Sequence, residues 1–76
     1  MRHIGSSNLW KADYDRAKME MKVVFLNRKN WLYTYKGVPI RVWTSFLKAE
    51  SKGQYFAASI KDNYIYSREI SNTNLR

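Results

Sequence analysis

The sequence predicts a small α+β domain, in which an antiparallel three-stranded meander is followed by two short helices packed on one face of the sheet. Three observations support this prediction. Two neighbouring segments alternate in side-chain character with a period of two, as half-buried strands do. A polar break of hairpin length separates them, which favours antiparallel pairing. Apolar residues then recur at helical spacing, and strands followed by helices are typical of the α+β class.

Each of the three expected strands has its own pattern. Residues 8–14 alternate weakly, and Asp15 and Arg16 follow them as a turn. Residues 19–25 alternate clearly, because Met19 and every second residue after it are apolar. The polar loop 27–30 then leads into residues 31–36, where the aromatic residues also alternate.

Helical spacing begins after Gly37 and Val38, which end the third strand. Pro39 suits the first turn of a helix. Apolar residues over positions 42–49 predict an amphipathic helix of about three turns. Ser51 and Gln54 have the spacing of a capping box, which predicts a second helix starting there.

The remaining residues are expected to close the domain. Asp62 and Asn63 end the second helix, and an extended segment after them packs against the sheet or the helices. A chain of 76 residues holds one domain, which we expect over residues 6–70. Residues 1–5 are expected to be a flexible basic arm, and residues 71–76 a polar tail. The packing residues are Tyr55, Phe56 and Ile60 on the helix, and Tyr64, Tyr66 and Ile70 after it.

Charge is the clearest pointer to function. The chain has 14 Lys and Arg against 6 Asp and Glu, which gives a net charge of +8. Self-repulsion of this size favours an anionic partner, and nucleic acid is the commonest one. The longest apolar run is only Val23 to Leu26, and the N-terminus has no apolar signal segment, so we expect a cytoplasmic protein without a membrane partner.

The sequence gives little support for an enzyme, a metal or a cofactor. The absence of Cys excludes thiolate ligands, and the one His, His3, lies in the expected arm. Asp13 and Asp15 could bind a hard cation, although we favour a solvated turn there. Gly5, Gly37 and Gly53 are too isolated for a phosphate loop. A phosphate held by Ser51 at the helix start, beside Lys52, is a minority reading.

Several motifs occur in a recognisable order along the chain. Ser6-Ser7-Asn8 is followed by Tyr14-Asp15, and Tyr33-Thr34-Tyr35 precedes Val38-Pro39. The most specific block is Ala49-Glu50-Ser51-Lys52-Gly53-Gln54-Tyr55-Phe56, because its residues are consecutive and unusual. Ile60-Lys61 and Tyr64-Ile65-Tyr66 complete the series. Over residues 6–70 these motifs resemble the KTSC domain, which is named after the C-terminal extension of some lysyl-tRNA synthetases.

The resemblance carries its own expectations. It implies a small α+β domain of a kind that also occurs as a stand-alone protein in bacteria and phages. RNA binding has been proposed for this family, and an appendage of a tRNA-charging enzyme fits that role. One departure is the hairpin over residues 25–35, which is slightly longer than usual and carries Arg28 and Lys29 in its loop.

The hairpin supplies the residue types that bind single strands, which are aromatic platforms and a basic groove. Trp31, Tyr33 and Tyr35 fall on one face of the third strand. If that face is open, bases could stack on it. If the helices cover it, Trp31 and Tyr33 are core, which we favour, and the charges become the better candidates. Lys48, Lys52, Lys61 and Arg68 lie around the second helix. The residues expected to bind are Arg28, Lys29, Tyr33, Tyr35, Lys36, Lys52 and Tyr55.

We therefore expect a non-catalytic nucleic-acid-binding module for RNA or single-stranded DNA. The alternative is a small protein-interaction module or regulator, such as a phage protein that docks on a host machine. Two short helices over a small sheet can leave an apolar patch for such a partner. Strand edges could also pair two copies, but lysines along the strands favour a monomer.

Overall fold

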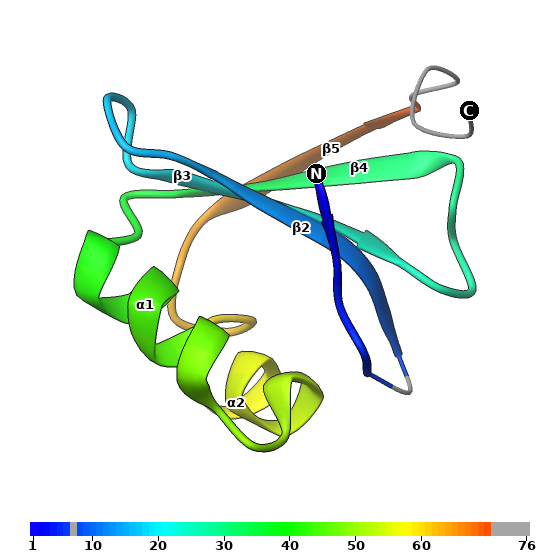
Figure 1. Ribbon diagram of the computed structural model, residues 1–76. Coiled ribbons are helices and arrows are strands. Elements are labelled where there is room, and N and C mark those ends of the chain that lie inside the picture. Colours follow the sequence, from blue (N-terminus) through cyan, green and yellow to red (C-terminus); the bar gives the residue numbers. More distant parts are fainter. Residues whose placement is uncertain (7, 71–76) are drawn as a thin grey trace.

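The computed structural model describes residues 1–6 and 8–70, and it forms an α+β fold with one antiparallel sheet and a pair of helices (Figure 1). The sheet has five strands in the order β1-β2-β3-β4-β5. The elements are β1 (Arg2–His3), β2 (Leu9–Asp15), β3 (Glu20–Phe25), β4 (Trp31–Lys36), α1 (Ile40–Lys48), α2 (Lys52–Ser59) and β5 (Tyr66–Ile70).

The expected α+β class is confirmed, but the expected number of strands is wrong, because the sheet has five strands and not three. The strand β1 has only 2 residues, too few to show any alternation in the sequence. The strand β5 pairs with β4 after the chain has passed through both helices. All of its residues are exposed, so it lacks the apolar alternation that marks a half-buried strand.

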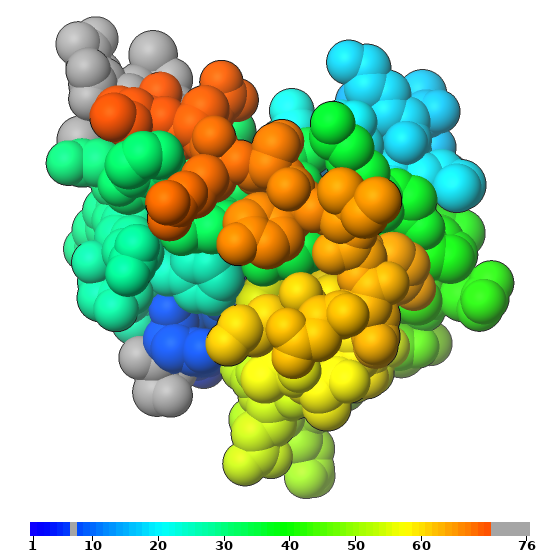
Figure 2. Space-filling view, turned by 180° about the vertical axis from the view of Figure 1, so that it is seen from behind, coloured from blue at the N-terminus to red at the C-terminus, as the bar shows by residue number. Residues whose placement is uncertain are grey.

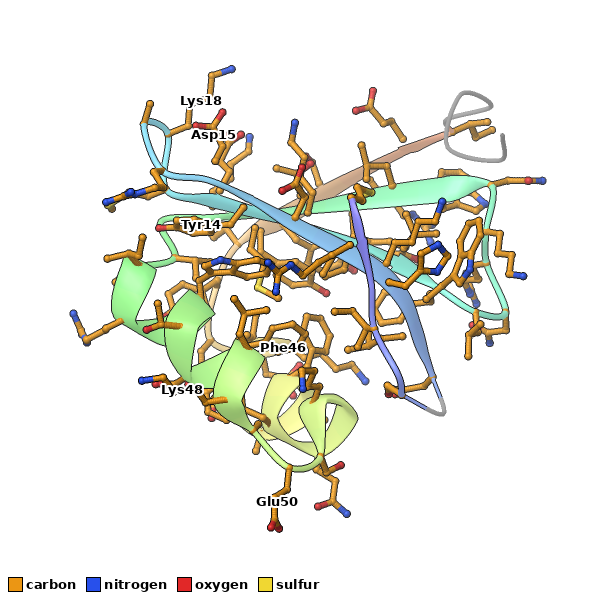
Figure 3. The ribbon with its side chains drawn as sticks, in the orientation of Figure 1. Tyr14, Asp15, Lys18, Phe46, Lys48 and Glu50 are labelled. Carbon is orange, nitrogen blue, oxygen red and sulfur yellow. The ribbon has the colours of Figure 1, made fainter. Side chains whose placement is uncertain are left out.

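The helices cover one face of the sheet, where the core lies (Figure 1). Met21 and Val23 of β3 and Tyr33 and Tyr35 of β4 point into this core from adjacent, paired positions. Phe46 of α1 is fully buried and points towards the sheet, whereas Lys48 and Glu50 point away from it (Figure 3). Burying large aromatic and aliphatic side chains is the main source of stability in a domain this small.

The first helix is held against the end of β2 by Tyr14. Its ring stacks on Trp43 of α1 with centroids 5.5 Å apart and planes 12° apart. Its hydroxyl donates a hydrogen bond to the carbonyl oxygen of Val38, 2.6 Å away. Burial raises the pKa of this hydroxyl, so it stays protonated as a donor. Tyr14 therefore connects β2 with both the entry to α1 and the helix itself.

The second helix begins at the predicted cap. The backbone N–H of Gln54 donates to Ser51 Oγ at 3.4 Å, as an N-cap requires. Gly53 in the first turn is buried, and a Cβ atom there would lie 2.5 Å from Asn8 Oδ1 and 2.8 Å from Ser6 Oγ. Glycine thus allows the segment before β2 to lie directly on the start of α2.

The N-terminal residues pair with the edge of the sheet. Residues 1–5 were expected to be a flexible arm, but Arg2 and His3 pair with β2 and Ile4 is buried against the core. This pairing gives the segment an ordered place at the edge of the sheet. The expected polar tail, 71–76, lies outside the described residues. Among the residues described, no helix is long and apolar enough to cross a membrane.

Candidate nucleic-acid interface

A groove of about 500 Å³ opens on the helix-bearing face of the sheet, between β4, β5, α2 and the turn that joins β3 to β4. Figure 2 looks towards the side of the molecule where β5, in orange, and α2, in yellow, are exposed. Both segments contribute residues to the groove. The groove is lined by Asn8, Phe25, Asn27, Arg28, Tyr33, Tyr35, Phe56, Ala57, Lys61, Asp62, Tyr66 and Arg68.

The aromatic lining of the groove is a connected cluster of rings. The register of β4 and β5 places Tyr66 directly beside Tyr35 and Arg68 directly beside Tyr33. Tyr66 lies with its ring centroid 5.6 Å from that of Tyr33 and 5.2 Å from that of Tyr35. Tyr33 and Tyr35 are only 7% and 2% exposed, whereas Tyr66 is 50% exposed. Tyr66 is therefore the ring that a ligand can reach.

Cationic side chains surround these rings. Arg28 comes from the β3–β4 turn, Lys61 follows α2, and Arg68 comes from β5. The guanidinium of Arg68 lies 4.9 Å from the centre of the Trp31 ring and donates to the Tyr33 hydroxyl at 3.4 Å. Asp62 is the one acidic residue in the lining, so the groove carries an excess of positive charge.

The buried Tyr35 lines the groove as an uncharged ring. Burial, with smaller contributions from the neighbouring Tyr66, Tyr33 and Asp62, raises the pKa of Tyr35 to about 12. The hydroxyl is therefore neutral at physiological pH, and no phenolate opposes an anionic ligand here.

The structure brings together three of the predicted site residues and separates the other four. Arg28, Tyr33 and Tyr35 line the groove. Lys36 ends β4 beyond that cluster. The ammonium group of Lys52 donates to the carbonyl oxygen of Ala49 at 3.3 Å. The other two are Lys29, whose ammonium group lies over Trp10, and Tyr55, which packs against the core beside Phe46.

The expectation that Trp31 and Tyr33 are core is met for Tyr33, which is buried, while Trp31 is half-buried against the core cluster. The cations and the exposed tyrosine of the groove that the predicted set omitted are Lys61, Arg68 and Tyr66. The pairing of β5 with β4 brings Tyr66 and Arg68 beside the buried tyrosines of β4. Lys61 lies between α2 and β5, so its place depends on the path of the helices. A prediction of β5 as a strand in register with β4 would have found Tyr66 and Arg68 but not Lys61.

The acidic residues Asp13 and Asp15, which could bind a cation by their sequence spacing, accept hydrogen bonds from the backbone. Asp15 Oδ1 accepts hydrogen bonds from the backbone N–H groups of Ala17 and Lys18, and so fixes the β2–β3 turn (Figure 3). Asp13 Oδ1 accepts from the backbone N–H of Tyr14. Within the described part of the chain, no group of three or more His, Cys, Asp or Glu residues could hold a metal ion.

The start of α2 is also occupied by the protein itself. Ser51 Oγ already accepts the hydrogen bond of the Gln54 N–H. The side chains of Ser6 and Asn8 lie so close to Gly53 that a Cβ atom on this residue would clash with them. This packing disfavours the minority reading of a phosphate at the start of the helix.

Both the sequence and the fold of this chain resemble those of known proteins. The family model of the KTSC domain matches residues 5–64. The chain belongs to the KTSC family. A crystal structure of a KTSC domain protein from Yersinia pestis is similar, with 29% sequence identity and a TM-score of 0.81. The alignment covers 90% of this chain and 93% of that one. No curated protein matches the chain.

The structure brings together the motifs that carry the family resemblance. Ser6 and Asn8 of the opening motif contact Gly53 of the Ser51-Lys52-Gly53 block. Tyr35 of the central motif packs edge-on against Phe56 of the same block, with ring centroids 5.3 Å apart. In this chain these motifs therefore build the junction of α2 and the sheet, and Tyr35 and Phe56 also line the groove.

Proposed function

We propose that this KTSC domain is a non-catalytic nucleic-acid-binding module that holds unpaired RNA or DNA in the groove. The observation that carries the proposal is the convergence of Arg28, Lys61 and Arg68 around the exposed ring of Tyr66. Proteins that bind single strands combine these same two features, a basic groove and aromatic stacking surfaces. The net charge of +8 adds long-range attraction for a polyanion.

Each side chain has a definite role in this proposal. The cations contact phosphates, and Tyr66 stacks on a base. Tyr33 and Tyr35 hold the Tyr66 ring in place by packing on it. Unpaired nucleotides fit better than a duplex, because a base can stack on Tyr66 only when it is not already stacked within a helix.

The first experiment is a fluorescence-anisotropy titration with single-stranded RNA, single-stranded DNA and a duplex at two salt concentrations. We expect micromolar or tighter binding of one single strand, and weakening as salt rises. Neutralising about four to six phosphates gives a log–log salt slope of roughly −3 to −4 for a single strand. Lack of binding at low salt would overturn the proposal.

A matched pair of charge variants tests the location of the site. Arg28→Ala with Lys29→Ala removes two charges from the β3–β4 turn beside the groove. Arg16→Ala with Lys18→Ala is the control. It removes two charges from the β2–β3 turn, which follows the end of β2 and does not line the groove. The first variant should weaken binding and leave the unfolding midpoint unchanged. Equal losses in both variants would mean that only overall charge matters.

A protein-interaction module is the second candidate, because β5 and the residue just before it expose apolar side chains at the edge of the sheet. Ile65 is 80% exposed and Ile70 is 63% exposed. An exposed strand edge can accept an extended segment of a partner. Retention of a bacterial or phage protein in a pull-down, lost on changing Ile65 and Ile70 to Ser, would support this role.

A further inference from the structure

Trp10 differs from the other two tryptophans in where it packs. Trp31 and Trp43 both pack against the hydrophobic core. Trp10 is half-buried, yet it belongs neither to the core cluster nor to the side chains packed on it. A large aromatic ring that adds nothing to the core of a 76-residue domain is an unusual use of apolar surface.

The side chains around Trp10 are cationic. The ammonium groups of Lys11 and Lys29 lie 4.3 Å and 4.5 Å from the centre of its ring. His3 of β1 meets the ring edge-on, with centroids 6.2 Å apart. Cations over an indole face are held by the electrostatic attraction of the ring. Two lysines and one indole thus share a small area, defined here as the Trp10 clamp.

The Trp10 clamp adjoins the groove through the two segments that carry it, the start of β2 and the β3–β4 turn. Asn8 lines the groove, and Trp10 lies two residues further along the chain. Arg28 lines the groove, and Lys29, which contacts Trp10, is the next residue. The backbone of Leu26 is hydrogen-bonded to the carbonyl oxygen of Asn8 at 3.0 Å, which joins these two segments. The clamp and the groove therefore meet at one end of the sheet.

We propose that the Trp10 clamp is a second stacking site for the same single strand, so that the strand leaves the groove past Arg28 and passes over Trp10. A base that stacks on the indole displaces an ammonium group from the ring. The flexible lysine stems allow the displaced group to contact the phosphate that accompanies the base. The ammonium group thus has a favourable partner both before binding, when it lies over the indole face, and after binding, when it contacts a phosphate.

This inference rests on the proposed function but makes a separate prediction about ligand length. A trinucleotide should occupy the groove alone, whereas a decanucleotide should reach the Trp10 clamp as well. Stacking on an aromatic side chain contributes enough that its removal should weaken binding by about fivefold or more. The gain in affinity from the short to the long ligand should therefore depend on Trp10.

The test compares the wild-type protein with Trp10→Ala and Tyr66→Ala, each titrated with both oligonucleotides. Trp10→Ala should lower affinity for the decanucleotide by about fivefold or more and leave affinity for the trinucleotide unchanged. Tyr66→Ala should lower both. Trp10→Phe, which keeps an aromatic face, should recover most of the affinity for the long ligand.

The outcomes separate this inference from the proposed function. If wild-type protein binds the two ligands equally tightly, or if Trp10→Ala weakens both ligands equally, the clamp is no second stacking site. The proposed function survives either result. If wild-type protein binds neither ligand at low salt, both ideas fail. Thermal unfolding of each variant, together with its trinucleotide affinity, shows whether the fold and the groove are intact.

Discussion

The hydroxyl of Tyr14 donates a hydrogen bond to the carbonyl oxygen of Val38, 2.6 Å away, across 24 residues of sequence. Tyr14 ends the core-facing side of β2, and Val38 lies just before α1. This bond fixes where the chain leaves the sheet for the first helix. The position of α2, and with it one wall of the groove, depends on that exit.

Tyr14→Phe keeps the ring stacked on Trp43 and removes the hydroxyl. The free energy of unfolding should fall by about 1 to 2 kcal/mol, because the Val38 carbonyl loses a donor. Urea denaturation measures the change. Tyr64→Phe is a suitable control, since its hydroxyl has no hydrogen bond among the described residues. Equal losses in both variants would contradict the role given to the Tyr14 hydroxyl.

Gly53→Ala tests the contact between α2 and the segment before β2. Alanine favours a helix by about 1 kcal/mol over glycine, so an open site would be stabilised. Here the new Cβ meets Asn8 Oδ1 and Ser6 Oγ, and we expect net destabilisation. Ser6→Gly with Asn8→Gly removes both obstacles, so the effect of Gly53→Ala should then be measured again in that shared background. A remaining loss there would show that the obstacle lies elsewhere.

The pKa of Tyr35, raised to about 12, predicts a loss of stability at high pH. Between pH 10 and 12 the tyrosine ionises in the unfolded chain while it stays protonated in the folded one. The unfolded state then binds fewer protons, so the free energy of unfolding falls as pH rises, by up to about 1.4 kcal/mol per pH unit. In Tyr35→Phe this part of the fall should be absent. Denaturant unfolding of both proteins from about pH 8 to pH 12 measures the difference, and parallel curves would contradict it.

Tyr33 provides a test that separates support from binding. Tyr33→Ala should destabilise the fold by about 3 to 5 kcal/mol, as large aromatic truncations in cores do. Tyr33→Phe keeps the ring that packs on Tyr66 and loses only the hydroxyl that accepts from Arg68. It should fold normally and bind nucleic acid with little change. If Tyr33→Phe abolished binding in a stable protein, the hydroxyl itself would be part of the site.

Local patterns predicted the parts of this fold whose residues are half-buried. The alternation from Met21 to Phe25 and the helical spacing around Phe46 each reflect one apolar and one polar face, and both elements are present. The strand β5 has no such signal, because its five residues are all exposed. Its register with β4 depends on contacts between residues that are far apart in the sequence, such as Tyr33 and Arg68.

The sequence likewise predicted the site residues that are close together in the chain and missed those that are far apart. Arg28, Tyr33 and Tyr35 could be selected because they belong to one hairpin, which is local in sequence. Lys61 and Arg68 could not be assigned to the same place, because their position relative to β4 depends on the path of both helices. The aromatic row of β4 was also ambiguous, since burial of Tyr33 depends on what the helices cover.

The strand β5 contributes to the groove of this chain without contributing to its core. It supplies Tyr66 and Arg68 to the groove, yet it buries no residue of its own and lies beyond the stretch, 5–64, that the family model matches. Substitutions in it need not disturb the packing of helices on sheet, which the other strands provide. Under the proposed function, the ligand preference of this chain can therefore be altered through one short segment without changing the residues that pack the helices on the sheet.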